Sequence, residues 1–205
     1  MKKELQVYNA GHILNEAMVD YRNKQAKEIN SIEGIKCYNV LDDKSINDKA
    51  NAEQTGLAER ILANDFKAMH GSDIFVFDVL NEGLGTIAEL GIILGMKHQA
   101  QETIKQLEET ADIFQCDFDG NVTDTYEILW GEIEELKKIL DKPVLCYCSD
   151  IRQGHGKPYL DPDRAELSTN QFVYGMVLEL TRGEGFTSWE EVKERLAALG
   201  SEANV

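Results

Sequence analysis

The sequence predicts an α/β fold in which a parallel sheet of about five strands is flanked by helices. Short apolar runs of β-forming residues alternate along the chain with longer segments of helical periodicity. The apolar runs end in polar or glycine-bearing loops, as strands do at the ligand-binding edge of an open parallel sheet. No internal repeat or linker divides the chain, so we expect residues 1–205 to form a single domain.

Four of the apolar runs are expected to be strands. The clearest is residues 74–77, because four successive apolar β-formers suit a strand that is buried on both faces of a parallel sheet. Asp78 follows at the point where this strand should end. Residues 5–10 and 35–41 precede this strand, and residues 143–149 form the last one.

Apolar residues recur at helical spacing between and after these runs. Residues 98–141 form a long connection between the third and the fourth strand, and we expect a helical insertion there that forms a subunit contact or covers the pocket. The expected helices are residues 15–29, 57–69, a helix from Thr86 onward, 101–112, 124–140, a helix after Asn170, and 189–199.

The composition argues against several classes of partner. The chain has 21 Lys and Arg against 37 Asp and Glu, a formal net charge of −16, which disfavours nucleic acid and anionic membranes. No apolar run approaches the roughly 20 residues of a membrane span. Residues 1–14 lack the core and cleavage site of a signal peptide, so we expect a cytoplasmic protein. The four cysteines show no zinc-ligand spacing, and we expect no metal.

Three carboxylates are expected to meet at one crevice beyond the third strand. Asp78 ends that strand, Glu82 lies in the following loop, and Glu89 lies in the first turn of the next helix. An acid in a first helical turn is often only a partner of the helix dipole. Here two further acids bracket the same loop, and Gly85 lets backbone or ligand come close. Carboxylates held around one pocket can act as acid and nucleophile at a glycosidic bond.

The segment 83–91, GLGTIAELG, resembles the Gly-Thr-x-x-Glu-x-Gly signature of the nucleoside 2-deoxyribosyltransferase family. The resemblance implies a flavodoxin-like fold and a nucleophilic role for Glu89, which would attack the anomeric carbon of deoxyribose. It also implies that Tyr8, at the end of the first strand, helps to position this carboxylate. Gly11 matches the glycine that follows the tyrosine in the family. The plainer interpretation of Tyr8 is a core aromatic at a strand end.

Two further positions fall at matching places, so that the resemblance covers residues 5–180. Asp65 belongs to an Asn-Asp pair before the third strand, and its counterpart in the family contacts the nucleobase. Asn170 matches an Asn that reaches the sugar in a neighbouring subunit, which implies a homo-oligomer with shared active sites. Without the resemblance, Asp65 would be read as part of a solvated face and Asn170 as an ordinary helix-start residue.

The chain departs from the family pattern at the acid that would transfer a proton to the base. Many members have an Asp two residues before the glycine of the signature, where this chain has Gly83. Either Glu82 or Asp78 could take this role. We favour Glu82, which replaces the displaced Asp, and expect Asp78 to hold the loop through backbone N–H groups.

The function that follows is transfer of 2-deoxyribose between nucleobases by double displacement, through a covalent deoxyribosyl-Glu intermediate and with retention of configuration. The substrates would be a deoxynucleoside and a free nucleobase, with no cofactor. One alternative is a nucleoside or deoxynucleotide N-glycosidase, although the first loop, NAGHILNEA, lacks the small hydroxyl and basic groups of a phosphate site. Another is a non-catalytic module that binds nucleosides without turnover.

Overall fold

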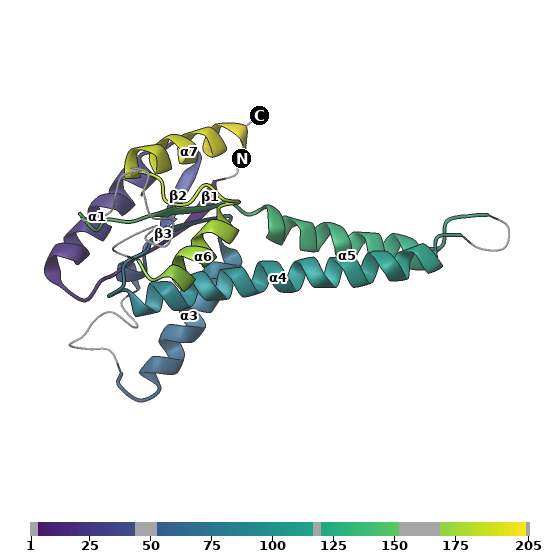
Figure 1. Cartoon of the computed structure of the whole chain (residues 1–205), viewed down its shortest axis with the longest axis horizontal. Coiled ribbons are helices and arrows are strands. Elements are labelled where there is room, and N and C mark those ends of the chain that lie inside the picture. The colour runs from purple at the N-terminus through teal and green to yellow at the C-terminus, as the bar shows by residue number, and fades with distance from the viewer. Residues whose placement is uncertain (1–3, 44–52, 117–119, 152–168, 204–205) are drawn as a thin grey trace. The chain divides into compact units, whose positions relative to one another are not determined.

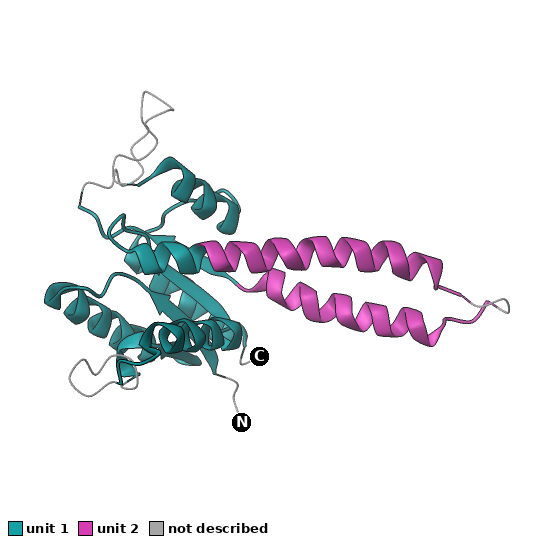
Figure 2. Ribbon diagram, turned by 90° about the horizontal axis from the view of Figure 1, so that it is seen from below, with its two compact units in different colours: residues 1–90, 143–205 teal, residues 91–142 magenta. Residues whose placement is uncertain are grey.

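The computed structural model describes residues 4–43, 53–116, 120–151 and 169–203. The chain divides into two compact units (Figure 2), one that contains the sheet and one that contains a pair of helical segments. The first unit is Met1–Leu90 with Pro143–Val205, and the second is Gly91–Lys142.

The sheet consists of four parallel strands, β1 (Leu5–Ala10), β2 (Ile35–Tyr38), β3 (Ile74–Asp78) and β4 (Val144–Tyr147) (Figure 1). The order β2-β1-β3-β4 matches the first four strands of the flavodoxin-like arrangement. The α/β class and the parallel sheet are therefore confirmed, but the described residues form four strands rather than about five.

The second strand is shorter than the sequence predicts. Residues 35–41 were expected to be extended, but the Asn39 side chain accepts the N–H of Leu41 at 3.3 Å and starts a 3-10 turn, η1 (Val40–Asp42). An Asn at such a position competes with the sheet by bonding its own backbone.

The core of the first unit lies around β3, whose five residues are all buried. Its register aligns Ile74 with Val7 and Phe77 with Cys146 on the neighbouring strands. The run has no polar residue before Asp78 because helices cover both faces of the sheet (Figure 1). Val76 packs in a buried apolar cluster of this unit together with Val7, Ile74 and Leu145.

The helices are α1 (Glu16–Asn30), α3 (Leu57–Gly71), α4 (Leu84–Ile113), α5 (Asp124–Asp141), α6 (Gln171–Leu180) and α7 (Trp189–Glu202). Two helices expected separately, from Thr86 onward and over residues 101–112, are one continuous helix, α4. The intervening residues KHQAQ include neither a proline nor a good N-cap residue, so nothing there ends one helix and starts another. No helix in the described ranges has the length and apolar character to cross a membrane.

The second unit contains the residues of α4 from Gly91 onward and the whole of α5. Ile104, Ala111 and Ile133 are buried in it. The Lys97 ammonium donates to the carbonyl oxygens of Leu140 at 2.5 Å and of Lys142 at 2.7 Å, which satisfies carbonyls that the end of α5 leaves open. The helical character expected of residues 98–141 is present here, whereas its expected role stays a prediction.

Candidate active site

A cavity of about 310 Å³ opens at the carboxyl edge of the sheet, next to the end of β1 and the start of α4. This volume lies at the small end of the range for small-molecule sites, about 300–1,000 Å³. Three carboxylates line the cavity: Asp65 from α3, Glu82 from the loop after β3, and Glu89 from α4. Apolar side chains form much of the rest, and Leu14 and Leu84 at its rim are largely exposed.

Glu89 is held by a tyrosine from the neighbouring strand. The phenol of Tyr8 donates to Oε1 of Glu89 at 2.7 Å, and Tyr8 is fully buried. Glu89 lies in the second turn of α4 rather than in the first, because the helix begins at Leu84. The dipole effect falls off beyond the first turn, so an ordinary dipole partner is a poorer explanation of Glu89 than the sequence suggested.

The surroundings of Glu89 favour its protonated form. Burial is the main cause that raises its pKa to about 7; the charge of Asp65 adds to the shift, and the hydrogen bond from Tyr8 opposes it. Burial also raises the pKa of Tyr8, with Glu89 as the next cause, so the phenol keeps its proton and acts as the donor. The cavity therefore contains a carboxyl group with a pKa of about 7, a value that suits acid–base chemistry and leaves the ionised form available at higher pH.

Asp65 has an unused acceptor. Its Oδ1 is buried and has no hydrogen-bond partner in the part of the chain that the structure describes, although Asp65 lines the cavity. Burial, followed by the charge of Asp43, raises the pKa of Asp65 to about 6. Its neighbour Asn64 instead donates to Asp43 at 2.8 Å. A ligand with an N–H or O–H group would satisfy the open oxygen of Asp65.

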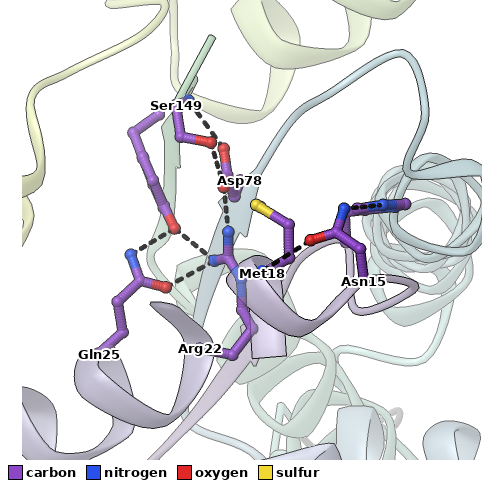
Figure 3. A network of polar contacts seen from close by, with 8 residues as sticks. Asn15, Met18, Arg22, Gln25, Asp78 and Ser149 are labelled. Carbon is purple, nitrogen blue, oxygen red and sulfur yellow. Dashed lines mark hydrogen bonds and ion pairs between the residues drawn. The ribbon is translucent and has the colours of Figure 1, made fainter. Parts of the chain in front are cut away.

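Gly11 lines the cavity, and a buried cation explains why no side chain fits there. A Cβ at Gly11 would lie 2.5 Å from Cζ of Arg22. Arg22 is buried, donates to Gln25 at 2.6 Å and forms an ion pair with Asp78 (Figure 3). It also donates to the hydroxyl of Tyr147 at 2.5 Å. The glycine is therefore required by packing, whether or not it also contacts a ligand.

Asp78 is not one of the residues that line the cavity. Besides the ion pair, it accepts the backbone N–H of Ser149 at 2.9 Å and the Ser149 hydroxyl at 2.7 Å (Figure 3). These bonds run to the segment after β4, not to the loop 79–85 as expected, because β4 is the sheet neighbour of β3. The substrate-binding role of Asp78 stays a prediction to which this geometry adds nothing.

The remaining expected residues divide between the cavity and the protein scaffold. Glu82 is exposed on its loop and lines the cavity, as does Gly85. Asn170 caps α6: its Oδ1 accepts the N–H groups of Phe172 at 2.9 Å and Val173 at 3.4 Å. The role of Asn170 in a neighbouring subunit stays a prediction.

Several residues of the cavity were not anticipated. His12 and Ile13 follow Gly11 in the first loop, Val40 comes from η1, and Ile61 and Thr86 come from α3 and α4. The position of His12 directly after a strand-end glycine was a usable signal. In the described ranges, no group of three His, Cys, Asp or Glu side chains is arranged to hold a metal ion.

Comparisons with known proteins extend the description of the fold. No model of a known protein family matches the chain. No curated protein sequence matches it. The crystal structure of a conserved protein from Enterococcus faecalis V583 is similar, with 15% identity and a TM-score of 0.56, over 96% of this chain and 99% of that one. At this identity the likeness concerns the fold alone.

Proposed function

We propose that the protein transfers 2-deoxyribose between nucleobases. The observation that carries the proposal is the pair of Tyr8 and Glu89, a buried phenol that donates at 2.7 Å to a carboxyl group in a cavity. The motif around Glu89 resembles the nucleoside 2-deoxyribosyltransferases, and the strand order supplies the fold that this resemblance implies.

In the first step, an oxygen of ionised Glu89 attacks the anomeric carbon of a deoxynucleoside. A C–O bond forms, the N-glycosidic bond breaks, and its electron pair goes to the departing base, which takes a proton from an acid such as Glu82. A second base then attacks the deoxyribosyl-Glu ester and gives its proton back to the acid. Two inversions give retention of configuration.

The role of Glu82 as the acid that protonates the departing base can be tested directly. Replacing Glu82 by Gln should slow turnover of bases that must be protonated to leave. It should have little effect on a deoxynucleoside whose base is already methylated to a cation. Equal losses on both substrates would assign proton transfer to another group.

The charges around the cavity favour a nucleoside over a nucleotide. Asp65, Glu82 and Glu89 line it, and no Lys or Arg does so among the described residues. Within that described lining, a phosphate group would meet three acids and no cation. The nucleoside N-glycosidase stays the second candidate, because water can enter a cavity whose rim is exposed.

One incubation separates the candidates. The protein is mixed with deoxyinosine and free adenine, and the products are resolved by chromatography. Deoxyadenosine indicates transfer, free deoxyribose indicates hydrolysis, and bound but unchanged deoxyinosine indicates a binding module.

The rate of transfer should rise with pH through about 7, because Glu89 must be ionised to attack and its pKa is raised to about 7. Replacing Tyr8 by Phe should move this midpoint upward, since the hydrogen bond from Tyr8 lowers the pKa of Glu89. Replacing Asp65 by Asn should move it downward, since the charge of Asp65 raises that pKa. The pH dependence of kcat/KM for the wild type and the two variants measures both shifts. If both variants moved the midpoint in the same direction, Glu89 would not be the group that titrates.

Gly85→Ala should weaken nucleoside binding by roughly tenfold without loss of stability. A Cβ at Gly85 meets no protein atom within 4 Å, so the methyl group would occupy open space beside the cavity. The helix itself should gain up to about 1 kcal/mol. Gly95→Ala is the matched control, because Gly95 also lies in α4 with open space around it but does not line the cavity. Titration calorimetry with deoxyinosine and thermal melting would compare the two variants; equal binding by both would contradict this placement of the ligand.

We also propose a homo-oligomer with shared active sites. Its one basis is Asn170, which matches a family residue that contacts the sugar in a neighbouring subunit. A solution mass of 23.1 kDa in a fully active sample would contradict it.

A further inference from the structure

His12 brings to the cavity a type of group that the rest of the lining lacks. Among the described lining residues, His12 has the one side chain with an N–H group. The carboxylates of Asp65, Glu82 and Glu89 can only accept hydrogen bonds when ionised, and Thr86 can both donate and accept. The chemistry of His12 therefore depends on which ring nitrogen carries the proton.

The contact with Asn15 favours one of the two ring nitrogens as the site of the proton. Asn15 is the N-cap of α1, and its Oδ1 accepts the N–H of Met18 at 2.9 Å. This bond, which Figure 3 shows, orients the amide. The other end of the amide, Nδ2, lies 3.5 Å from Nε2 of His12. An amide nitrogen is a donor only, so this contact favours the tautomer in which Nε2 accepts and Nδ1 carries the proton of the neutral ring.

The Nδ1–H group is then free for a ligand. His12 is partly buried, and within the described ranges its ring has no hydrogen-bond partner other than Asn15. We propose that His12, held as the Nδ1–H tautomer by Asn15, donates a hydrogen bond to a carbonyl oxygen of the nucleobase. This inference rests on the proposed function, because it names the group on the base that the same cavity recognises.

A base carbonyl fits this donor better than a sugar hydroxyl does. A hydroxyl group can donate to one of the three carboxylates that line the cavity, and so needs no N–H partner. A carbonyl oxygen only accepts, and an ionised carboxylate cannot satisfy it. Oδ1 of Asp65, which has no partner among the described residues, would accept an N–H group of the same base. The protein would then offer the base one acceptor, Asp65, and one donor, His12.

Side-chain nitrogen NMR tests the tautomer without turnover. In the wild type, neutral His12 should show a protonated Nδ1 and an unprotonated Nε2. Asn15→Asp keeps the capping oxygen but places an acceptor opposite Nε2, so the proton should move to Nε2 or the ring should become doubly protonated. Asn15→Ser, which also caps, should leave a mixture of tautomers. A wild-type ring with the proton on Nε2, or the same tautomer in all three proteins, would overturn the inference.

Ligand titration and kinetics test the carbonyl. Hypoxanthine, which carries an oxo group, should shift the Nδ1–H signal of His12, and unsubstituted purine should not. His12→Leu should lower kcat/KM for deoxyinosine roughly tenfold but that for purine deoxyriboside less than about twofold, while His12→Asn, whose amide nitrogen replaces Nδ1, should recover most of the loss. Equal losses on both nucleosides would place the contact on the sugar and overturn the inference.

The two proposals fail in different ways. If the wild type turns over neither nucleoside, the proposed transfer is wrong, and the hypoxanthine and purine titrations still decide the role of His12. If the wild type transfers deoxyribose and hypoxanthine leaves the Nδ1–H signal in place, the function stands and the role of His12 is wrong. Thermal melting of each variant excludes a general loss of structure.

Discussion

Replacing Glu89 by Gln should lower deoxyribosyl transfer by a factor of at least about 100. The amide has the shape of the carboxyl group but cannot form the ester with the anomeric carbon. Tyr8 can still donate to the amide oxygen, so the cavity should keep its form. The rate of deoxyadenosine formation from deoxyinosine and adenine measures the effect, and deoxyinosine binding should persist. Glu89→Ala should lose transfer to the same extent.

The intermediate gives this prediction a second readout. Acid quenching of the wild type with deoxyinosine alone should leave a deoxyribosyl group on the peptide that contains Glu89, detectable by mass spectrometry. The Gln variant should show none. Activity above about a hundredth of the wild-type rate, or a labelled peptide elsewhere in the chain, would assign the nucleophile to another residue.

The same variant should alter the pH dependence of stability. The pKa of Glu89 is raised from 4.5 to about 7 in the folded protein, so folding favours the protonated form. The stabilisation from this group is complete below the unfolded value and is lost as the pH rises through about 7. The free energy of unfolding of Glu89→Gln should therefore fall less than that of the wild type between pH 5 and pH 8 (about the limits of the titration).

The meeting of Tyr8 and Glu89 was expected from the family resemblance, and the arrangement of the sheet explains why the two side chains come together. β1 and β3 are adjacent and parallel, so the end of one and the helix after the other reach the same edge of the sheet. The apolar runs and the glycine-bearing loop predict the crevice and place Glu89 there, but the sequence pattern alone indicates for Tyr8 only a core aromatic at a strand end. The position of Asp65 at the same cavity was also expected from the resemblance alone, because nothing in the sequence of its helix indicates that Asp65 faces a ligand.

The partner of Asp78 could not be predicted in this way. Arg22 is 56 residues away and lies on a helix whose pattern gives no reason to expect a buried cation. Asp78 was therefore assigned to the ligand crevice, whereas its bonds go to Arg22 and Ser149. The end of β2 was misplaced by a few residues for a simpler reason, because the local bond of the Asn39 side chain decides a boundary that periodicity leaves open. The start of α4 was also misplaced by two residues, since the helix begins at Leu84.

The buried pair of Arg22 and Asp78 leads to the second large effect, which is on stability. Asp78→Asn should lower the free energy of unfolding by about 3–5 kcal/mol, because it leaves the Arg22 guanidinium without its counter-charge at a site where both side chains are almost fully buried. Such a loss is a large part of the total stability of a typical domain, about 5–15 kcal/mol. Urea denaturation at constant pH measures it.

A double-mutant cycle separates the pair from the rest of the fold. Arg22→Met should be destabilising by itself, but the double variant Arg22→Met with Asp78→Asn should lose much less than the sum of the two, because no unpaired charge remains buried. Lys24→Ala is the control, since Lys24 pairs with Glu28 at 3.7 Å on the exposed face of the same helix and should cost less than about 1 kcal/mol. Additive losses in the cycle would show that the two charges do not depend on each other. The ion pair with Asp78 would then not be what holds the Arg22 guanidinium next to Gly11, and other contacts of Arg22 would have to fix its position there.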